Sequence, residues 1–264
     1  MSPVIIATLS IAIIGLVIGL LLVNVGKAFA VHVDPREEAV RGALPGNNCG
    51  ACGYAGCDAM AAAIAKGEAA VNGCPVGGDP VAEIIAQIMD VEAGHIEKHV
   101  AFVKCAGDCE KASQKANYVG IADCQGAVAA GLSPKGCDYG CLGLGSCVKA
   151  CPFDAIHVVS GIAVVDRTVC RACGKCVSAC PRHLIELLPD ASQYAVQCAN
   201  RDRGPAVKKV CSTGCIGCKI CEKQCENDAV HVENNISHID YDKCQNCGKC
   251  AEKCPAKVIA RRYA

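Results

Sequence analysis

The fold of this chain is decided by the stretch Cys170-Arg-Ala-Cys173-Gly-Lys-Cys176-Val-Ser-Ala-Cys180-Pro181. Its spacing is C-x2-C-x2-C-x3-C-P, in which three closely spaced thiolates bind one iron–sulfur cluster and the fourth Cys reaches a second cluster. The same run returns 74 residues later, as Cys244, Cys247, Cys250, Cys254 and Pro255. Because every such run shares its clusters with a second run, we expect each one to have a partner.

Both partner runs are present. One consists of Cys215, Cys218, Cys221 and Cys225, and the other of Cys137, Cys141, Cys147 and Cys151. An offset of 74 residues superposes the two halves, mapping Cys124 onto Cys198 and Cys137 onto Cys211, which indicates one internal duplication. Each copy therefore reads as a bacterial-type two-cluster ferredoxin module. Short hairpins are expected in the apolar segments 155–165 and 229–240.

Crossing the fourth ligands gives four expected cluster sites. In the first copy they are Cys137, Cys141 and Cys147 with Cys180, and Cys170, Cys173 and Cys176 with Cys151. In the second copy they are Cys215, Cys218 and Cys221 with Cys254, and Cys244, Cys247 and Cys250 with Cys225. Position 144 is Leu where the second copy has Cys218, so Cys137 is expected to take that place.

A fifth site is expected upstream, where the spacing is C-x2-C-x4-C-x16-C. Its ligands are Cys49, Cys52, Cys57 and Cys74. The glycines between the first three let the backbone approach the sulfurs, so that N–H groups can tune a cluster. The Ala-rich segment 58–66 predicts a helix that leads towards the fourth ligand.

Five cysteines remain after these assignments. The group Cys105, Cys109 and Cys124 predicts three ligands of a sixth cluster, with Cys198, Cys211 or Cys137 as the fourth. The alternative is that some of these thiols are small buried apolar residues, because free Cys packs well in cores. The sequence predicts at least five 4Fe–4S clusters and leaves the sixth open.

Other cysteine chemistries fit this pattern poorly. Structural zinc is usually bound by two separated C-x2-C pairs rather than by three cysteines within seven residues. A disulfide scaffold is normally a short secreted chain with an even number of cysteines, whereas this chain has 264 residues and 25 cysteines. A catalytic nucleophile would need one Cys near a His, not tandem arrays, so no catalytic residue is assigned.

The N-terminal segment predicts a membrane anchor. Val4–Val23 is an uncharged run of 20 residues, which is enough to span a bilayer as a helix. Lys27, Arg36 and Arg41 follow it, so the positive-inside rule places the rest of the chain in the cytoplasm. A secretory signal cleaved near 28–30 is the alternative, but the segment lacks a positive n-region. Many thiols also favour a reducing compartment.

These patterns predict an α+β chain in four parts. They are an anchor over 1–27, a small helical 4Fe–4S domain over 28–90, a first ferredoxin module over 91–197 and a second over 198–264. Helices are expected from Asp34-Pro35 and from Asp79-Pro80, the second with an apolar stripe of Val81, Ile84, Ile85 and Ile88, and a strand is expected over 95–103. The net charge is zero, and one basic group (Arg201, Arg203, Lys208, Lys209) reads as a solvated linker or as a surface that steers an acidic ferredoxin. Neither a G-x-G-x-x-G fingerprint nor a P-loop is found, so we expect no nucleotide site and no nucleic-acid partner.

The order of these parts resembles the B subunit of the Rnf electron-transport complex. The resemblance rests on the anchor, the segment from Leu44 to Cys57, Cys74-Pro75 and the modules that follow, and it covers essentially the whole chain. It implies a subunit that takes electrons from reduced ferredoxin and passes them towards flavin- and NAD-binding subunits. It also implies coupling to the transport of Na⁺ or H⁺, with no indication of the ion or of the physiological direction.

Two alternatives belong to other classes of protein. A membrane-tethered polyferredoxin could serve a hydrogenase or dehydrogenase without ion pumping. The Cys49 to Cys74 motif also resembles the cluster domain of corrinoid iron–sulfur proteins, although the chain lacks a large cobalamin-binding domain.

Overall fold

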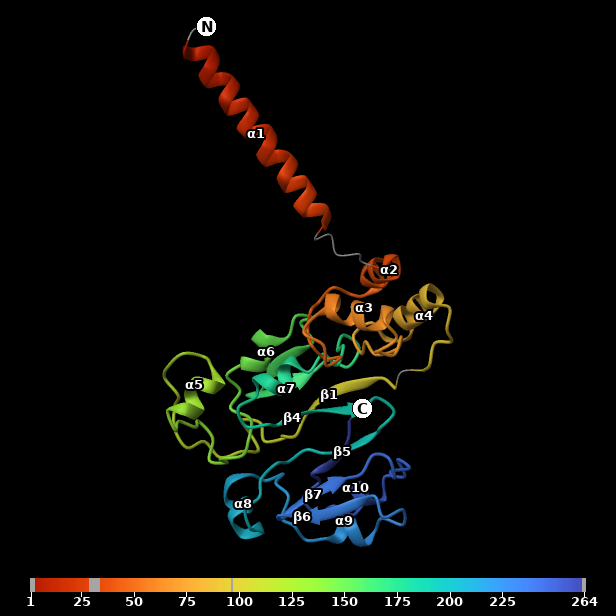
Figure 1. Ribbon diagram of the computed structural model, residues 1–264. Coiled ribbons are helices and arrows are strands. Elements are labelled where there is room, and N and C mark those ends of the chain that lie inside the picture. The colour runs from red at the N-terminus through yellow and green to blue at the C-terminus, as the bar shows by residue number, and fades with distance from the viewer. Residues whose placement is uncertain (1–2, 29–33, 96, 263–264) are drawn as a thin grey trace.

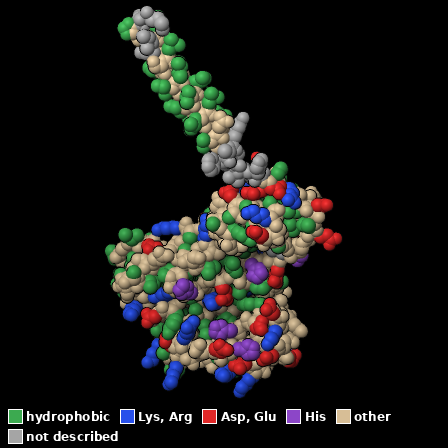
Figure 2. All heavy atoms as spheres, viewed as in Figure 1, with side chains coloured by type: hydrophobic (Ala, Val, Ile, Leu, Met, Phe, Trp, Pro, Cys, Tyr) green, Lys and Arg blue, Asp and Glu red, His purple; other side chains and the backbone are tan. Residues whose placement is uncertain are grey.

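The computed structural model describes residues 3–28, 34–95 and 97–262. Helix α1 (Pro3–Ala28) projects away from the rest of the chain, and Figure 1 shows the remaining elements stacked below it. Its side chains are almost all apolar, whereas charged side chains cover the other parts (Figure 2). Among the described residues, α1 is the one helix that is long and apolar enough to cross a membrane. Phe29 and Ala30, which belong to the alternative cleavage site, lie outside the described residues.

Three helices form the small domain next to α1: α2 (Pro35–Ala43), α3 (Cys57–Ala65) and α4 (Gly78–Met89). Asp34 caps α2 as expected, since its side chain accepts a hydrogen bond from the Arg36 N–H at 2.9 Å. The expected stripe on α4 is wrong at one position, because Ile85 is fully buried but Ile84 is 49% exposed. The helix therefore packs on α2 and α3 through a narrower face than the apolar pattern predicts.

The first repeat contains four strands and three short helices. Its elements are β1 (His99–Val103), α5 (Cys124–Ala129), α6 (Ser146–Ala150), β2 (Ile156–Val159), β3 (Ile162–Val165), α7 (Lys175–Ala179) and β4 (Ile185–Pro189). Strands β2 and β3 form the expected hairpin, and β1 pairs antiparallel with β4. The strand β1 begins at His99, four residues later than expected.

The second repeat has the same plan. Its elements are β5 (Tyr194–Val196), α8 (Gly204–Val210), α9 (Ile220–Lys223), β6 (Val230–Glu233), β7 (Ile236–Ile239), α10 (Lys249–Glu252) and β8 (Ile259–Arg261). Strands β6 and β7 form the second expected hairpin, and β5 pairs antiparallel with β8. Because β5 pairs with β8, the segment Tyr194–Val196 lies against the C-terminal strand of the second repeat. The four basic side chains on and before α8 are all exposed.

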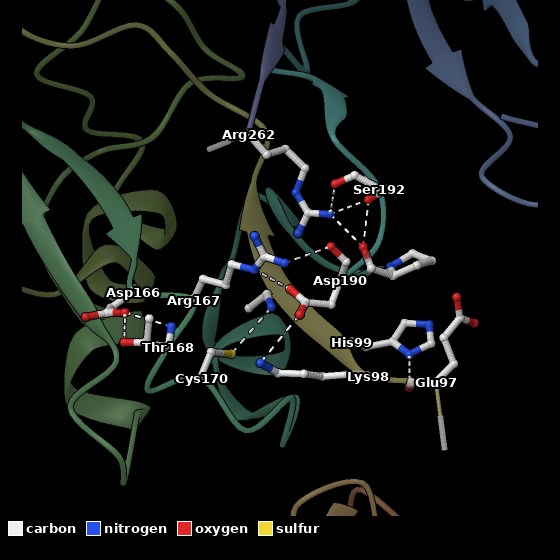
Figure 3. Close-up of polar contacts among 12 residues, drawn as sticks. Glu97, Lys98, His99, Asp166, Arg167, Thr168, Cys170, Asp190, Ser192 and Arg262 are labelled. Carbon is white, nitrogen blue, oxygen red and sulfur yellow. Dashed lines mark hydrogen bonds and ion pairs between the residues drawn. The ribbon is translucent and has the colours of Figure 1, made fainter. Parts of the chain in front are cut away.

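The two repeats are joined where β4 ends and β8 ends (Figure 3). Arg262, which follows β8, donates hydrogen bonds to the carbonyl oxygens of Pro189 at 2.8 Å and Ser192 at 3.2 Å. Asp190 forms ion pairs with Arg167 at 2.5 Å and with Lys98 at 3.5 Å. The C-terminal strand of the second repeat is thereby tied to the last strand of the first, and the repeats form a continuous stack with the small domain.

Candidate iron–sulfur sites

Each cysteine run contains a short helix that begins one residue before its third Cys. These cysteines occupy the second position of α6, α7, α9 and α10, and they are Cys147, Cys176, Cys221 and Cys250. The residue before each helix has a positive φ, between 60° and 79°, and is Gly in three cases and Lys219 in the fourth. All four thiols are buried, so the local turn directs them into the interior rather than to solvent.

Backbone N–H groups point at several of the sulfurs. The Ala155 N–H donates to Cys151 Sγ at 3.4 Å, and its equivalent in the second repeat, Ala229, donates to Cys225 Sγ at 3.3 Å. The Leu184 N–H donates to Cys180 Sγ at 3.4 Å. Such contacts suit an anionic thiolate and are a means by which a protein tunes a bound cluster.

The first hollow contains a cysteine that the spacing assigned elsewhere. A cavity in the first repeat is lined by four cysteines, namely Cys124, Cys141, Cys147 and Cys180. The sequence predicted Cys137 in place of Cys124. Cys137 lines a different hollow, whereas Cys124, the first residue of α5, lies in this one with Cys141 and Cys147.

Polar contacts explain the position of Cys124. Asp123 caps α5 by accepting a hydrogen bond from the Gly126 N–H, and its other carboxylate oxygen accepts one from Ser146 Oγ at 2.6 Å. The Cys124 N–H in turn donates to Ser146 Oγ at 2.7 Å. Since Ser146 begins α6, these bonds hold Cys124 beside Cys147.

The equivalent hollow in the second repeat has the expected members. A cavity there is lined by Cys215, Cys218, Cys221 and Cys254. Burial raises the pKa of the Cys221 thiol, and the neighbouring Cys215 and Cys254 add to this effect. Three of the four thiols therefore lie close enough for their charges to interact.

The remaining run of each repeat also gathers its cysteines. Burial and the neighbouring Cys170 and Cys173 raise the pKa of Cys176 to about 12, with a further contribution from Cys151. In the second repeat, burial and the neighbouring Cys244 raise the pKa of Cys250 to about 11, with Cys247 also contributing. Cys225 packs against the same core cluster as Cys250.

The small domain brings its cysteines together around one loop. Cys57 begins α3, and its N–H donates to Asn48 Oδ1 at 2.8 Å, which closes the loop that carries Cys49. Burial raises the pKa of Cys74, and the neighbouring Cys52 and Cys57 contribute to the rise. Cys49 lies close enough to Cys173 of the first repeat for its charge to raise the pKa of that thiol, although burial of Cys173 is the larger cause.

The five unassigned cysteines divide differently from the expectation. Cys105, Cys137, Cys198 and Cys211 line a further cavity between the two repeats. Cys109 is exposed and contacts the hairpin turn at Gly161. The members of the predicted trio, Cys105, Cys109 and Cys124, thus have three different surroundings in the structure. Within the described residues, no three His, Cys, Asp or Glu side chains are close enough to surround a single metal ion.

Comparison with protein-family models agrees with these positions. The FeS iron–sulfur cluster family matches residues 44–76, and a 4Fe-4S dicluster domain matches residues 132–181. Two 4Fe-4S binding domains match residues 212–228 and 237–260. The fold and these matches define an α+β iron–sulfur protein whose chemistry is electron transfer.

Several curated proteins are similar over nearly the whole chain. The B subunit of the Na(+)-translocating ferredoxin:NAD(+) oxidoreductase complex of Acetobacterium woodii is 46% identical over 93% of this chain and 74% of its own length. The B subunit of the ion-translocating oxidoreductase complex of Methanosarcina acetivorans is 43% identical over 99% of this chain and its full length. The B subunit of the proton-translocating ferredoxin:NAD(+) oxidoreductase complex of Clostridium ljungdahlii is 44% identical over 98% of this chain and 93% of its own length.

The chain therefore belongs to the family of B subunits of ion-translocating oxidoreductase (Rnf) complexes. It is an electron-transfer subunit of such a complex, and its apolar helix α1 is in keeping with association with a membrane.

Proposed function

We propose that this chain accepts electrons from soluble reduced ferredoxin and relays them to flavin- and NAD-binding subunits of the same membrane complex. The names of two relatives include ferredoxin:NAD(+) oxidoreductase, one with Na⁺ and one with proton translocation. The donor sets fit 4Fe–4S clusters, because each offers four thiols around one hollow or loop together with backbone N–H donors. When bound, these clusters supply one-electron redox chemistry.

Five cluster sites follow from the cysteine sets. They are named here by their place: the loop site (Cys49, Cys52, Cys57, Cys74), the α7 site (Cys170, Cys173, Cys176, Cys151), the α6 site (Cys124, Cys141, Cys147, Cys180), the α9 site (Cys215, Cys218, Cys221, Cys254) and the α10 site (Cys244, Cys247, Cys250, Cys225). On this assignment each repeat is a two-cluster ferredoxin module, and the two modules stand in tandem after the small domain.

The observation that carries the proposal is the succession of neighbouring sites. Cys49 of the loop site acts electrostatically on Cys173 of the α7 site. Cys147 of the α6 site acts on Cys176 of the α7 site, and in the second repeat Cys221 of the α9 site acts on Cys250 of the α10 site. Cysteines of adjacent sites therefore lie close together within each repeat and between the small domain and the first repeat, as an electron relay requires.

Helix α1 is suited to attach the chain to a membrane. We infer a single membrane span by α1, with the rest of the chain in the cytoplasm, from Lys27, Arg36 and Arg41 on its C-terminal side. Ionisable side chains within a span are the usual mark of an ion pathway, and Val4–Val23 carries none. Ion transport then belongs to other subunits, and this chain supplies the electrons that drive it.

Anaerobic purification of the complex from membranes tests the proposal. The chain should co-purify with flavin-containing subunits, contain at least about 20 iron atoms and no stoichiometric zinc, and support NAD⁺ reduction by reduced ferredoxin. Co-purification with a hydrogenase and no flavin would instead establish a membrane-tethered polyferredoxin. Stoichiometric zinc, together with less than half of the expected iron content, would exclude both the electron-transfer subunit and the polyferredoxin.

A further inference from the structure

We propose that Cys105, Cys137, Cys198 and Cys211 bind a sixth iron–sulfur cluster, which bridges the two repeats. Each repeat contributes two of the four thiols that line the cavity between them. This junction site differs from the other five, whose ligands all come from one repeat or from the small domain.

The four thiols form two equivalent pairs. Cys105 lies two residues after β1, and Cys198 lies two residues after β5. The residues before them make matching hydrogen bonds, from the Lys104 N–H to the Leu184 carbonyl at 2.7 Å and from the Gln197 N–H to the Val258 carbonyl at 2.8 Å. Cys105 and not Cys124 is therefore the structural counterpart of Cys198.

The second pair keeps the offset of the duplication. Cys137 and Cys211 are 74 positions apart, whereas Cys105 and Cys198 are 93 positions apart. The difference, 93 − 74 = 19 residues, is the extra length of the loop that carries α5 in the first repeat. The cavity is lined by the matching segments 104–107 and 197–200. The two repeats therefore contribute equivalent residues to the site.

Short contacts bring the four sulfurs to one place. A Cβ atom added at Gly107 would lie 3.3 Å from Cys211 Sγ and 3.7 Å from Cys105 Sγ. One added at Gly140 would lie 3.5 Å from Cys137 Sγ and 3.7 Å from Cys105 Sγ. Asn200 completes the set, since its side-chain Nδ2 donates to Cys137 Sγ and its backbone N–H donates to Cys198 Sγ, both at 3.4 Å.

Hydrogen bonds connect the junction site to both neighbouring sites. The N–H of Cys141, in the α6 site, donates to Cys105 Sγ at 3.4 Å. The N–H of Cys215, in the α9 site, donates to Cys198 Sγ at 3.4 Å. These two bonds are equivalent under the duplication, so each repeat joins its own first cluster to the shared site in the same way.

A buried cation favours negative charge in this cavity. Lys135 is 4% exposed, lines the cavity and donates to the carbonyl oxygens of Gly107 at 2.7 Å and Gly161 at 2.8 Å. A buried ammonium is costly unless an anion lies nearby, and a cluster ligated by thiolates supplies one. The cavity thus offers the donor atoms, the hydrogen bonds and the compensating charge that a cluster needs.

This inference rests on the proposed electron relay and completes it. With the junction site, neighbouring cysteines connect the loop, α7, α6, junction, α9 and α10 sites in one series. One electron leaves the reduced cluster of one repeat and reduces the junction cluster, which is reoxidised as it passes that electron on, with no bond or proton transferred. Six sites use 24 of the 25 cysteines and leave Cys109, which is exposed.

Metal analysis of the anaerobically purified complex tests the site. The wild-type chain should contain about 24 iron atoms, and the double variant Cys105→Ala/Cys211→Ala, which removes one ligand from each repeat, should contain about 20. Cys109→Ala is the matched control and should keep about 24. The single variant Cys211→Ala should retain at most a three-iron cluster, recognised by its electron paramagnetic resonance signal in the oxidised protein.

The outcomes separate this inference from the proposed function. About 20 iron atoms in the wild type, or an unchanged iron content in the double variant, would overturn the junction site while leaving the five-site relay in place. One zinc per chain that is lost in the double variant would overturn it too. If the double variant does not assemble, the wild-type iron content and the Cys211→Ala spectrum still show whether the junction site binds a cluster. Normal iron without ferredoxin-dependent NAD⁺ reduction would contradict the proposed function alone.

Discussion

At the scale of single residues, a ligand's position depends on polar side chains that are not ligands themselves. The carboxylate of Asp123 accepts hydrogen bonds from Ser146 Oγ and from the Gly126 N–H. The hydrogen bond from Ser146 is the main reason why the pKa of Asp123 lies below its ordinary value. These contacts place Cys124 beside Cys147, although the two are far apart in the sequence.

Replacing Cys124 by Ala should therefore damage the α6 site. We expect the chain to lose between one and four iron atoms, because the site retains only three thiols. Iron analysis and the electron paramagnetic resonance spectrum of the reduced complex measure the loss. The control variant Cys109→Ala changes an exposed residue, so it should leave the iron content and the spectrum unchanged. An intact spectrum in the Cys124 variant, together with a lost cluster in Cys180→Ala, would show that another residue completes the site.

The spacing of the runs predicts which cysteines lie together where both runs of a pair keep all four cysteines at the ferredoxin spacing. The set Cys215, Cys218, Cys221 and Cys254 was predicted from spacing alone and lines one cavity. Cys124 and Cys137 could not be placed in this way, because their partners come from distant segments that only the tertiary fold brings together. The signal that could have found Cys124 was the Leu at position 144, which left the run one ligand short.

At the scale of elements, a close approach of two loops closes the α6 site. Gly143 has a φ of 73°, and a Cβ atom at this position would lie 2.5 Å from the carbonyl oxygen of Gly161 in the β2–β3 hairpin. Gly145 has a φ of 79°, but a Cβ atom there would meet nothing within 4 Å. Gly143 is therefore needed for its left-handed backbone conformation and for the close contact with Gly161. Gly145 is needed only for its left-handed conformation.

This difference predicts unequal effects of two similar substitutions. Gly145→Ala should cost about 1–2 kcal/mol, the usual penalty of a left-handed conformation for Ala. Gly143→Ala should cost more, because the hairpin must also move away from the cysteine loop. The midpoint of the thermal loss of the visible iron–sulfur absorption, measured anaerobically, compares the two. Equal midpoints would mean that the contact with Gly161 is not needed.

The elements were predictable to the extent that their contacts are local. The hairpins β2–β3 and β6–β7 were expected from two short apolar segments around a turn, and both are confirmed. The pairings β1–β4 and β5–β8 join strands more than 60 residues apart, and β5 has only three residues. Such a strand is stable only because its partner is present, so its existence could not be inferred from the sequence.

At the scale of the whole molecule, the sites follow the order of the domains away from α1. Figure 1 shows the small domain next to α1, the first repeat beyond it and the second repeat at the far end. The loop site therefore lies closest to the membrane anchor, and the α10 site lies in the most distant domain. An electron carrier that docks from solution finds the second repeat most accessible.

The orientation of the chain gives a prediction of its own. If Lys27, Arg36 and Arg41 keep their end of α1 in the cytoplasm, a reporter fused after Ala264 should be active only there. A cytoplasmic fluorescent reporter and a periplasmic phosphatase, fused at the same residue, provide opposite readouts. Phosphatase activity of the fusion would contradict both the orientation and the assignment of α1 as an anchor rather than a cleaved signal.

The succession of sites also predicts where electrons enter and leave. Cys52→Ala should remove the loop site, and we expect ferredoxin to reduce the remaining clusters normally while ferredoxin-dependent NAD⁺ reduction is lost. Cys247→Ala, in the α10 site, should slow the first reduction by ferredoxin instead, because it removes the outermost site. Stopped-flow absorbance of the assembled complex distinguishes the two defects, since only the second affects the initial bleaching.

The interpretation of these variants depends on assembly and on cluster loss. Each variant must co-purify with its partner subunits and lack about four iron atoms, so that a defect reports on one missing site. A Cys52 variant that meets both conditions and still supports full NAD⁺ reduction would show that electrons leave from a site other than the loop. Impaired entry in Cys52→Ala with normal entry in Cys247→Ala would reverse the order, because ferredoxin would then dock beside the membrane anchor rather than at the far repeat.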